Sequence, residues 1–212
     1  MSVNTQEMKI VHCVLRRESR LLMELVAAVA PGDTARAGVV ADHFRDYRLG
    51  LHNHHEGEDE LLWPPLLARV DLEADVVLRM EAQHERIAAT LTRLDAAVPA
   101  WEATAGADER DILVAALADH RAVLLTHLDD EEATLLPLAA EHITEREWAS
   151  LGGHLVNNTP KLTLLTLLGA VLEDANPAER AIVLGGLPAP VRFIWHAVGR
   201  PRYARHIRRV RG

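Results

Sequence analysis

A repeated pairing of histidine with glutamate constrains this chain more than any other feature. The segments His54–Pro64 and His127–Pro137 begin 73 residues apart and carry His, Glu, Leu and Pro at four matching positions. His12 and His84, which precede the two segments, lie 72 residues apart. Repeats that serve packing alone would repeat apolar residues, with no reason to repeat His and Glu. The sequence therefore predicts two copies of one helical hairpin related by a pseudo-two-fold axis.

The composition and spacing of the chain predict an all-α fold. Apolar residues make up 49% of the sequence but aromatic residues only 4%, and the strong helix formers Ala and Leu dominate. Short connections between long amphipathic segments favour antiparallel neighbours, so we expect an up-down four-helix bundle. Its helices are predicted at residues 5–30, 33–68, 72–97 and 108–142.

Prolines and capping residues set the expected ends of these helices. Pro64 and Pro65 should kink or end the second helix, and Pro99 should stop the third. Asp108 is the expected cap of the fourth. Cys13, which follows His12, is expected to be a core residue that points away from the site.

We expect two regions in the chain, a bundle at residues 1–142 and a short helical C-terminal extension at residues 143–212. Thr144 to Glu147 resembles a capping box that opens a short helix, and Gly152-Gly153 is expected to interrupt that helix. The apolar stretch 162–172 should pack against the bundle.

The extension ends in a basic tail. Seven arginines and no acidic residue lie between Pro190 and Gly212, although the formal net charge of the whole chain is −8. Such a tail can contact nucleic acid or an anionic surface, or it can dock on the acidic body of its own chain.

The repeated residues have the chemistry and spacing of a metal site. A His and a Glu four residues apart share one helix face, about 6 Å apart along the axis. Imidazole and carboxylate ligands suit iron, manganese and zinc, and the single cysteine excludes a cysteine-rich zinc site. The candidates are too numerous for one tetrahedral ion and suit two ions with an open position. The six candidate ligands are His12, His54, Glu58, His84, His127 and Glu131.

Some assignments stay open at this level. A single His-x-x-x-Glu on a helix is usually a solvated pair, and only the repeat favours metal. The repeat selects His54, but His55 with Asp59 is a rival register. Tyr47 and His120 each lie seven residues before a candidate histidine. We expect Tyr47, His55 and His120 to be pocket or supporting residues.

Over residues 5–142 the sequence resembles the hemerythrin/HHE cation-binding family. The resemblance rests on the pattern H…HxxxE…H…HxxxE, and it implies a four-helix bundle with a non-haem di-iron centre. It implies bridging carboxylates from Glu58 and Glu131, with the four histidines as terminal ligands. Two iron ions are thus the expected cofactor, with manganese or zinc as lesser alternatives.

The chain departs from the oxygen-carrying members of that family at two places. Those carriers place a second histidine four residues from the one on the third helix, whereas this chain has Met80 and Ala88 around His84. They also place an aspartate where Glu132 stands. The resemblance therefore implies one histidine fewer and an additional open coordination position.

The function expected from these features is binding of, or reaction with, O₂, NO or peroxide at a di-iron centre. One alternative is a di-iron oxidative or catalase-like enzyme, and another is a structural metal-binding interaction module. The sequence has no Gly-rich phosphate loop and no nucleophile elbow. The polar N-terminal segment and the lack of about 20 consecutive apolar residues predict a cytoplasmic protein without a membrane span.

Overall fold

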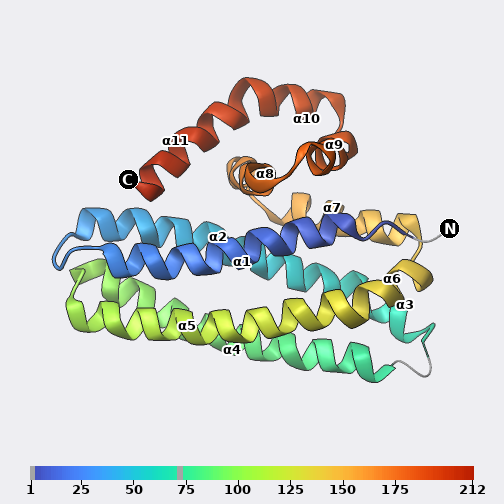
Figure 1. The fold of residues 1–212 in the computed structure, drawn as a ribbon, viewed down its shortest axis with the longest axis horizontal. Coiled ribbons are helices and arrows are strands. Elements are labelled where there is room, and N and C mark those ends of the chain that lie inside the picture. Colours follow the sequence, from blue (N-terminus) through green and yellow to red (C-terminus); the bar gives the residue numbers. More distant parts are fainter. Residues whose placement is uncertain (1–2, 71–73) are drawn as a thin grey trace.

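The computed structural model describes residues 3–70 and 74–212, in which every regular element is a helix. The all-α prediction is confirmed. The four longest helices pack side by side, and successive ones run in opposite directions (Figure 1). Each contacts two of the other three around the bundle. They are α1 (Gln6–Ala28), α2 (Thr34–Leu61), α4 (Ala74–Thr104) and α5 (Ala107–Asp130).

The short connection between α1 and α2 is determined by local sequence. Gly32 adopts a positive φ of 81°, a conformation that costs glycine little. The side chain of Asp33 then accepts a hydrogen bond from the backbone N–H of Arg36 at 2.9 Å and caps α2. At the other end of α2, Pro64 and Pro65 lie in the separate short helix α3 (Trp63–Leu67), so α2 ends before them as predicted.

Two apolar clusters fill the bundle at different levels. One includes Leu51 of α2 and Leu128 of α5, and the other includes Leu62, Met80 and Leu135. His54 and Glu58 of α2 and Glu131 lie in the interval between the two clusters, and His127 of α5 lies next to Leu128 at the edge of the first cluster. Apolar packing on both sides keeps this polar layer away from water.

The last bundle helix contains a widened turn. The chain continues from α5 through a π-helical segment, η1 (Glu131–Leu135), into α6 (Leu136–His142). Pro137 lies in the first turn of α6, where its missing backbone N–H costs little. Such π-helical turns often occur at functional sites, and this one carries Glu131.

The C-terminal helices lie on the side of the bundle formed by α1 and α2 (Figure 1). Thr144 and Glu147 form the predicted capping box of the first of them. These elements are α7 (Glu145–Asn158), α8 (Lys161–Asp174), α9 (Pro177–Gly186), α10 (Ala189–Ile194), η2 (Trp195–Gly199) and α11 (Arg200–Arg211).

Six of the seven arginines of the basic tail lie in α11, which packs against α8 and α2. Arg211 pairs with Glu173 at 2.6 Å, and Arg209 lies 3.6 Å from Asp42. The tail thus makes ion pairs with the acidic body of its own chain. A further contact with nucleic acid or an anionic surface stays a prediction. Within residues 3–70 and 74–212, no helix has both the length and the apolar composition needed to cross a bilayer.

Two predicted helix boundaries in the bundle are wrong. Helix α4 continues through Pro99 to Thr104, because Val98 and Trp101 are buried in the core on either side of it. Their packing outweighs a proline that costs about 3 kcal/mol in a helix interior. Gly106, not Asp108, is the N-cap of α5, and Asp108 lies in its first turn. The predicted start of the third helix at Leu72 lies outside the described residues.

Two smaller expectations also fail. Helix α7 runs through Gly152 and Gly153 without interruption. A helix tolerates glycine at a cost of about 1 kcal/mol, which its capping box and its packing on α2 offset. Cys13 is exposed rather than buried, because the buried face of α1 follows His12 and Leu15. The division into regions 1–142 and 143–212 stays a prediction.

Candidate metal centre

The four bundle helices bring the six predicted ligands to one level of the core. His12 comes from α1, His84 from α4 and His127 from α5, and all three are buried. Glu58 of α2 and Glu131 of η1 are completely inaccessible to solvent. The nitrogen and oxygen atoms of these side chains form two groups that share one residue.

The first group contains His12, His54, Glu58 and Glu131, whose potential ligand atoms all lie within 4.8 Å of one another. The Nε2 atom of His12 lies 3.3 Å from Oε2 of Glu131. The Nε2 atom of His54 lies 3.6 Å from Oε1 of Glu58. Helices α1 and α2 and the π-helical segment η1 supply these four side chains.

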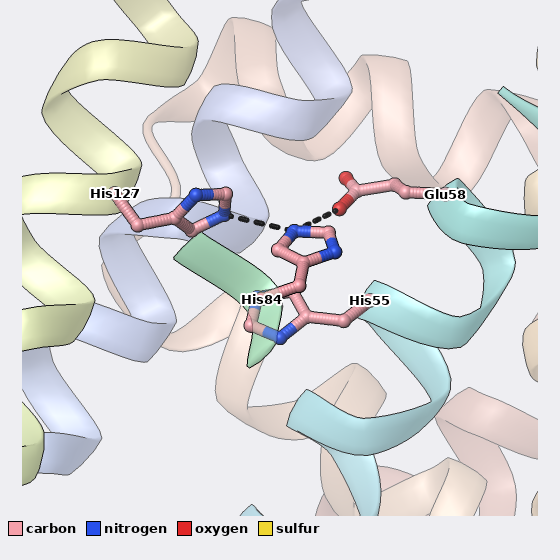
Figure 2. A group of neighbouring side chains, drawn as sticks. All are labelled: His55, Glu58, His84 and His127. Carbon is pink, nitrogen blue, oxygen red and sulfur yellow. Dashed lines mark hydrogen bonds and ion pairs between the residues drawn. The ribbon is translucent and has the colours of Figure 1, made fainter. Parts of the chain in front are cut away.

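The second group contains His55, Glu58, His84 and His127, again within 4.8 Å of one another (Figure 2). The Nε2 atom of His84 lies 3.5 Å from Oε2 of Glu58 and 3.2 Å from Nε2 of His127. The ring of His55 stacks on that of His84 with centroids 4.1 Å apart. Here α2, α4 and α5 supply the side chains.

Glu58 joins the two groups. Its Oε1 atom faces His54 of the first group, whereas its Oε2 atom faces His84 of the second. A carboxylate in this position can give one oxygen to each of two neighbouring ions. Glu131 has a related place, because its Oε2 atom lies 3.3 Å from Nε2 of His12 and 3.4 Å from Nε2 of His127.

Carboxylates outside the two groups orient two of the histidines. The Nδ1 atom of His12 lies 3.0 Å from Glu132, and that of His84 lies 2.7 Å from Asp59. An ionised carboxylate only accepts hydrogen bonds, so each Nδ1 donates and Nε2 is the ring atom left to bind a ligand once its own proton is displaced. Carboxylate support of this kind is common behind metal-binding histidines. Asp59 of the rival register is therefore a supporting residue.

The unsatisfied polar atoms test whether these residues fit a metal. Buried side-chain atoms normally have hydrogen-bond partners, because burial without one is costly. In the described part of the chain, several buried ligand atoms of the two groups have none. A cation between them would supply the missing interactions, so the donor set fits a metal. These atoms are Nε2 of His12, His54 and His55 and both carboxylate oxygens of Glu58 and Glu131.

Burial and mutual charge shift the pKa values within the groups. Burial and the neighbouring Glu131 raise the pKa of Glu58 well above its usual range. Burial alone would lower the pKa of His12, but Glu131 and Glu132 raise it to about 9. Burial and the charge of His12 lower the pKa of His54 to about 3. Without a cation, protons on Glu58 and His12 would offset the negative charge of the buried carboxylates. Metal binding must displace these protons.

His55 is the residue whose place sequence reasoning missed. It was expected as a supporting residue, but its buried ring lies in the second group beside His84. The sequence signal was the adjacent pair His54-His55, since neighbouring helical residues point about 100° apart and can enter different groups. His55 thereby supplies a histidine near His84, where Met80 and Ala88 provide none.

Tyr47 and His120 form a buried pair away from the ligand groups. The Tyr47 hydroxyl lies 2.7 Å from Nε2 of His120, whose Nδ1 lies 2.7 Å from Oγ1 of Thr90. Thr90 donates its own proton to the Ile87 carbonyl, so it accepts from Nδ1, and Tyr47 donates to Nε2. Burial lowers the pKa of His120 to about 4, which keeps the ring neutral.

A cleft of about 480 Å³, the acidic cleft, reaches the second group from the surface between α2 and α4. His55 and His84 lie at its inner side, and none of the described residues that line it is Lys or Arg. Its remaining lining is rich in carboxylates, which attract cations. The acidic residues that line it are Glu56, Asp59, Glu81 and Glu85.

The comparisons with known proteins agree with this geometry. The Hemerythrin HHE cation binding domain family matches residues 3–139, which include all the helices that supply ligand atoms. No curated protein and no solved structure matched the chain. The family match covers well over half of the sequence and contains both groups. The chain is a member of the hemerythrin HHE cation-binding family, a family of metal-binding helical domains.

Proposed function

We propose that the two groups bind a pair of iron ions and that this di-iron centre binds or reacts with O₂, NO or peroxide. The observation that carries the proposal is the shared Glu58, whose two oxygens face different histidine groups. A buried carboxylate between two nitrogen-rich sites suits two adjacent cations better than one. Imidazole and carboxylate ligands without a thiolate agree with iron, and also accommodate manganese or zinc.

The chain's own residues would hold and shield this centre. His12, His54 and Glu131 would hold one ion, and His55, His84 and His127 the other, with Glu58 between them. Asp59 and Glu132 keep His84 and His12 in the tautomer that presents Nε2. When bound there, a ferrous pair would supply electrons and coordination positions for small oxygen- or nitrogen-containing ligands.

The acidic cleft supports delivery of cations to the site. Its carboxylates lead from the surface to His55 and His84, which would be the first ligands that an incoming ion meets. Because divalent cations are attracted to a cleft of this charge, loading should weaken as ionic strength rises.

A di-iron enzyme, catalase-like or oxidative, is the second candidate. It is favoured by a second cavity, an apolar chamber of about 210 Å³ lined by His54, Glu58 and apolar residues of α1, α2, α7 and α8. This chamber would admit a molecule larger than a diatomic. Tyr47 and His120, the expected pocket residues, are hydrogen-bonded to each other and so offer no free proton donor to a substrate. The third alternative, a structural metal module, has no need of a carboxylate shared between two ligand groups.

The deciding experiment is elemental analysis of protein purified without added metal, before and after reconstitution with ferrous iron. We expect about two irons per chain, and a lower melting temperature after removal of the iron by chelation. O₂, NO and hydrogen peroxide are then added separately to the ferrous protein, and absorbance and peroxide consumption are followed. Sustained peroxide consumption would favour the enzyme. Less than one iron per chain after reconstitution would refute the di-iron proposal.

A further inference from the structure

The C-terminal extension forms one wall of an apolar chamber that lies beside the candidate metal-binding groups and is partly open to solvent. The chamber has a volume of about 210 Å³ and lies between helices α1 and α2 of the bundle and helices α7 and α8 of the extension. Six of its sixteen lining residues therefore lie beyond the family match, which ends at residue 139. Its apolar lining includes Met8, Val11, Leu15, Trp148, Leu155 and Leu167.

Two small residues of α2 allow the extension to approach the bundle closely. A Cβ atom at Gly50 would lie 3.0 Å from Leu167 of α8, and one at Gly57 would lie 3.4 Å from His154 of α7. The contact at Gly50 is tighter than ordinary packing and the one at Gly57 is an ordinary van der Waals contact, so side chains longer than a methyl group would push against the extension. The position of the chamber roof thus depends on glycines that lie on the same helix as Glu58.

The polar groups of the chamber are confined to a few places. The side-chain amide of Asn53 donates to the Asn158 carbonyl and to the Thr159 hydroxyl, so it is satisfied within the protein. His54 and Glu58 also line the chamber, and their buried ligand atoms lack hydrogen-bond partners. A molecule in the chamber therefore meets apolar walls and, at one end, the first ligand group.

We propose that the chamber binds a small neutral apolar organic molecule, of the size of a single aromatic ring with a short substituent, beside the first ligand group. An apolar protein cavity of about 150 Å³ is large enough to stay dry and bind benzene. The larger chamber accommodates such a molecule, and its lining offers a charged compound no opposite charge apart from the ligand residues and Glu7. The role of this molecule as a reactant rests on the proposed di-iron function, but its binding does not.

Two adjacent glycines of α7 provide a matched test. Gly152 lines the chamber and Gly153 does not, although both are exposed and a Cβ at either would meet nothing within 4 Å. Leucine at either position should favour the helix, so neither variant is expected to lose its fold. Only Gly152→Leu would place a new side chain at the chamber.

The measurement is toluene binding to the metal-free full-length protein, by calorimetric titration and by ligand-observed NMR. We expect saturable binding by the wild type, at least about 10-fold weaker binding by Gly152→Leu, and wild-type affinity in Gly153→Leu. Absence of saturable binding by the wild type would overturn the proposal, and so would equal weakening by both variants.

Metal content of the same proteins separates this proposal from the proposed function. Neither glycine supplies a ligand atom, so both variants should bind as much iron as the wild type. Toluene binding by a protein that takes up no iron would support the chamber and refute the di-iron centre. Two irons per chain without toluene binding would refute the chamber alone.

Discussion

The two halves of the bundle use matching residues in matching ways. Helices α1 and α2 form one half, and α4 with α5 and η1 form the other. Each glutamate of the repeat faces two histidines. One lies four residues earlier in the same half, and the other lies on the first helix of the opposite half. The residue after each glutamate bonds the same first-helix histidine, Asp59 to His84 and Glu132 to His12. The repeat thus encodes the supporting carboxylates as well as the ligands.

The halves differ at one position inside the site. His55 of the first half corresponds, 73 residues later, to Leu128, a buried core residue. His55 enters the second group, whereas Leu128 packs in the larger apolar cluster. The surroundings differ as well, since the first group borders the apolar chamber and the second borders the acidic cleft. A repeated frame can therefore hold two sites with different access.

The largest effect is expected from the shared glutamate. Glu58→Ala should reduce iron from about two ions per chain to nearly none, because Glu58 belongs to both groups. Glu131→Ala should retain more iron, since Glu131 belongs to the first group and meets the second only through His127, 3.4 Å from its Oε2 atom. Elemental analysis after reconstitution measures both. Glu60→Ala, an exposed change on the same helix, is the control. Full iron content in Glu58→Ala would show that the glutamate does not bridge two ions.

An intermediate effect is expected from removing the asymmetric histidine. His55→Leu makes the first half like the second at this position and removes one of four ligand residues from the second group. We expect iron to fall towards one ion per chain, with the first group still loaded. His52→Leu, at a half-exposed position one turn earlier, is the control. Two tightly bound irons in His55→Leu would contradict the assignment of His55 as a ligand.

The smallest effect is expected where the two halves meet in the core. Tyr47 and His120 occupy corresponding positions, 73 residues apart, and bond each other. Tyr47→Phe leaves Nε2 of His120 buried without a donor, which should lower the free energy of unfolding by about 1–3 kcal/mol. Urea denaturation measures this loss, and iron content should stay unchanged. A drop in iron content would give the pair a direct role in metal binding.

Local sequence predicted much of the bundle but not its exceptions. The capping box at Thr144 and the end of α2 before Pro64 depend on short-range geometry, and both appear as expected. Pro99 and Gly152 were expected to break helices and do not. At Pro99 the burial of Val98 and Trp101 decides the outcome, and that burial depends on neighbouring helices that local propensity does not describe.

The sequence by itself determined which side chains could act together. The helical repeat places a histidine and a glutamate four residues apart on one face, and two copies predict two facing ligand sets. Only the tertiary structure decided that both His54 and His55 enter the site. Their side chains point about 100° apart on α2, and His55 meets a ligand group only because α4 and α5 lie beside it. It also decided where the extension lies, since the chamber depends on close contacts between residues more than a hundred positions apart, such as Gly50 and Leu167.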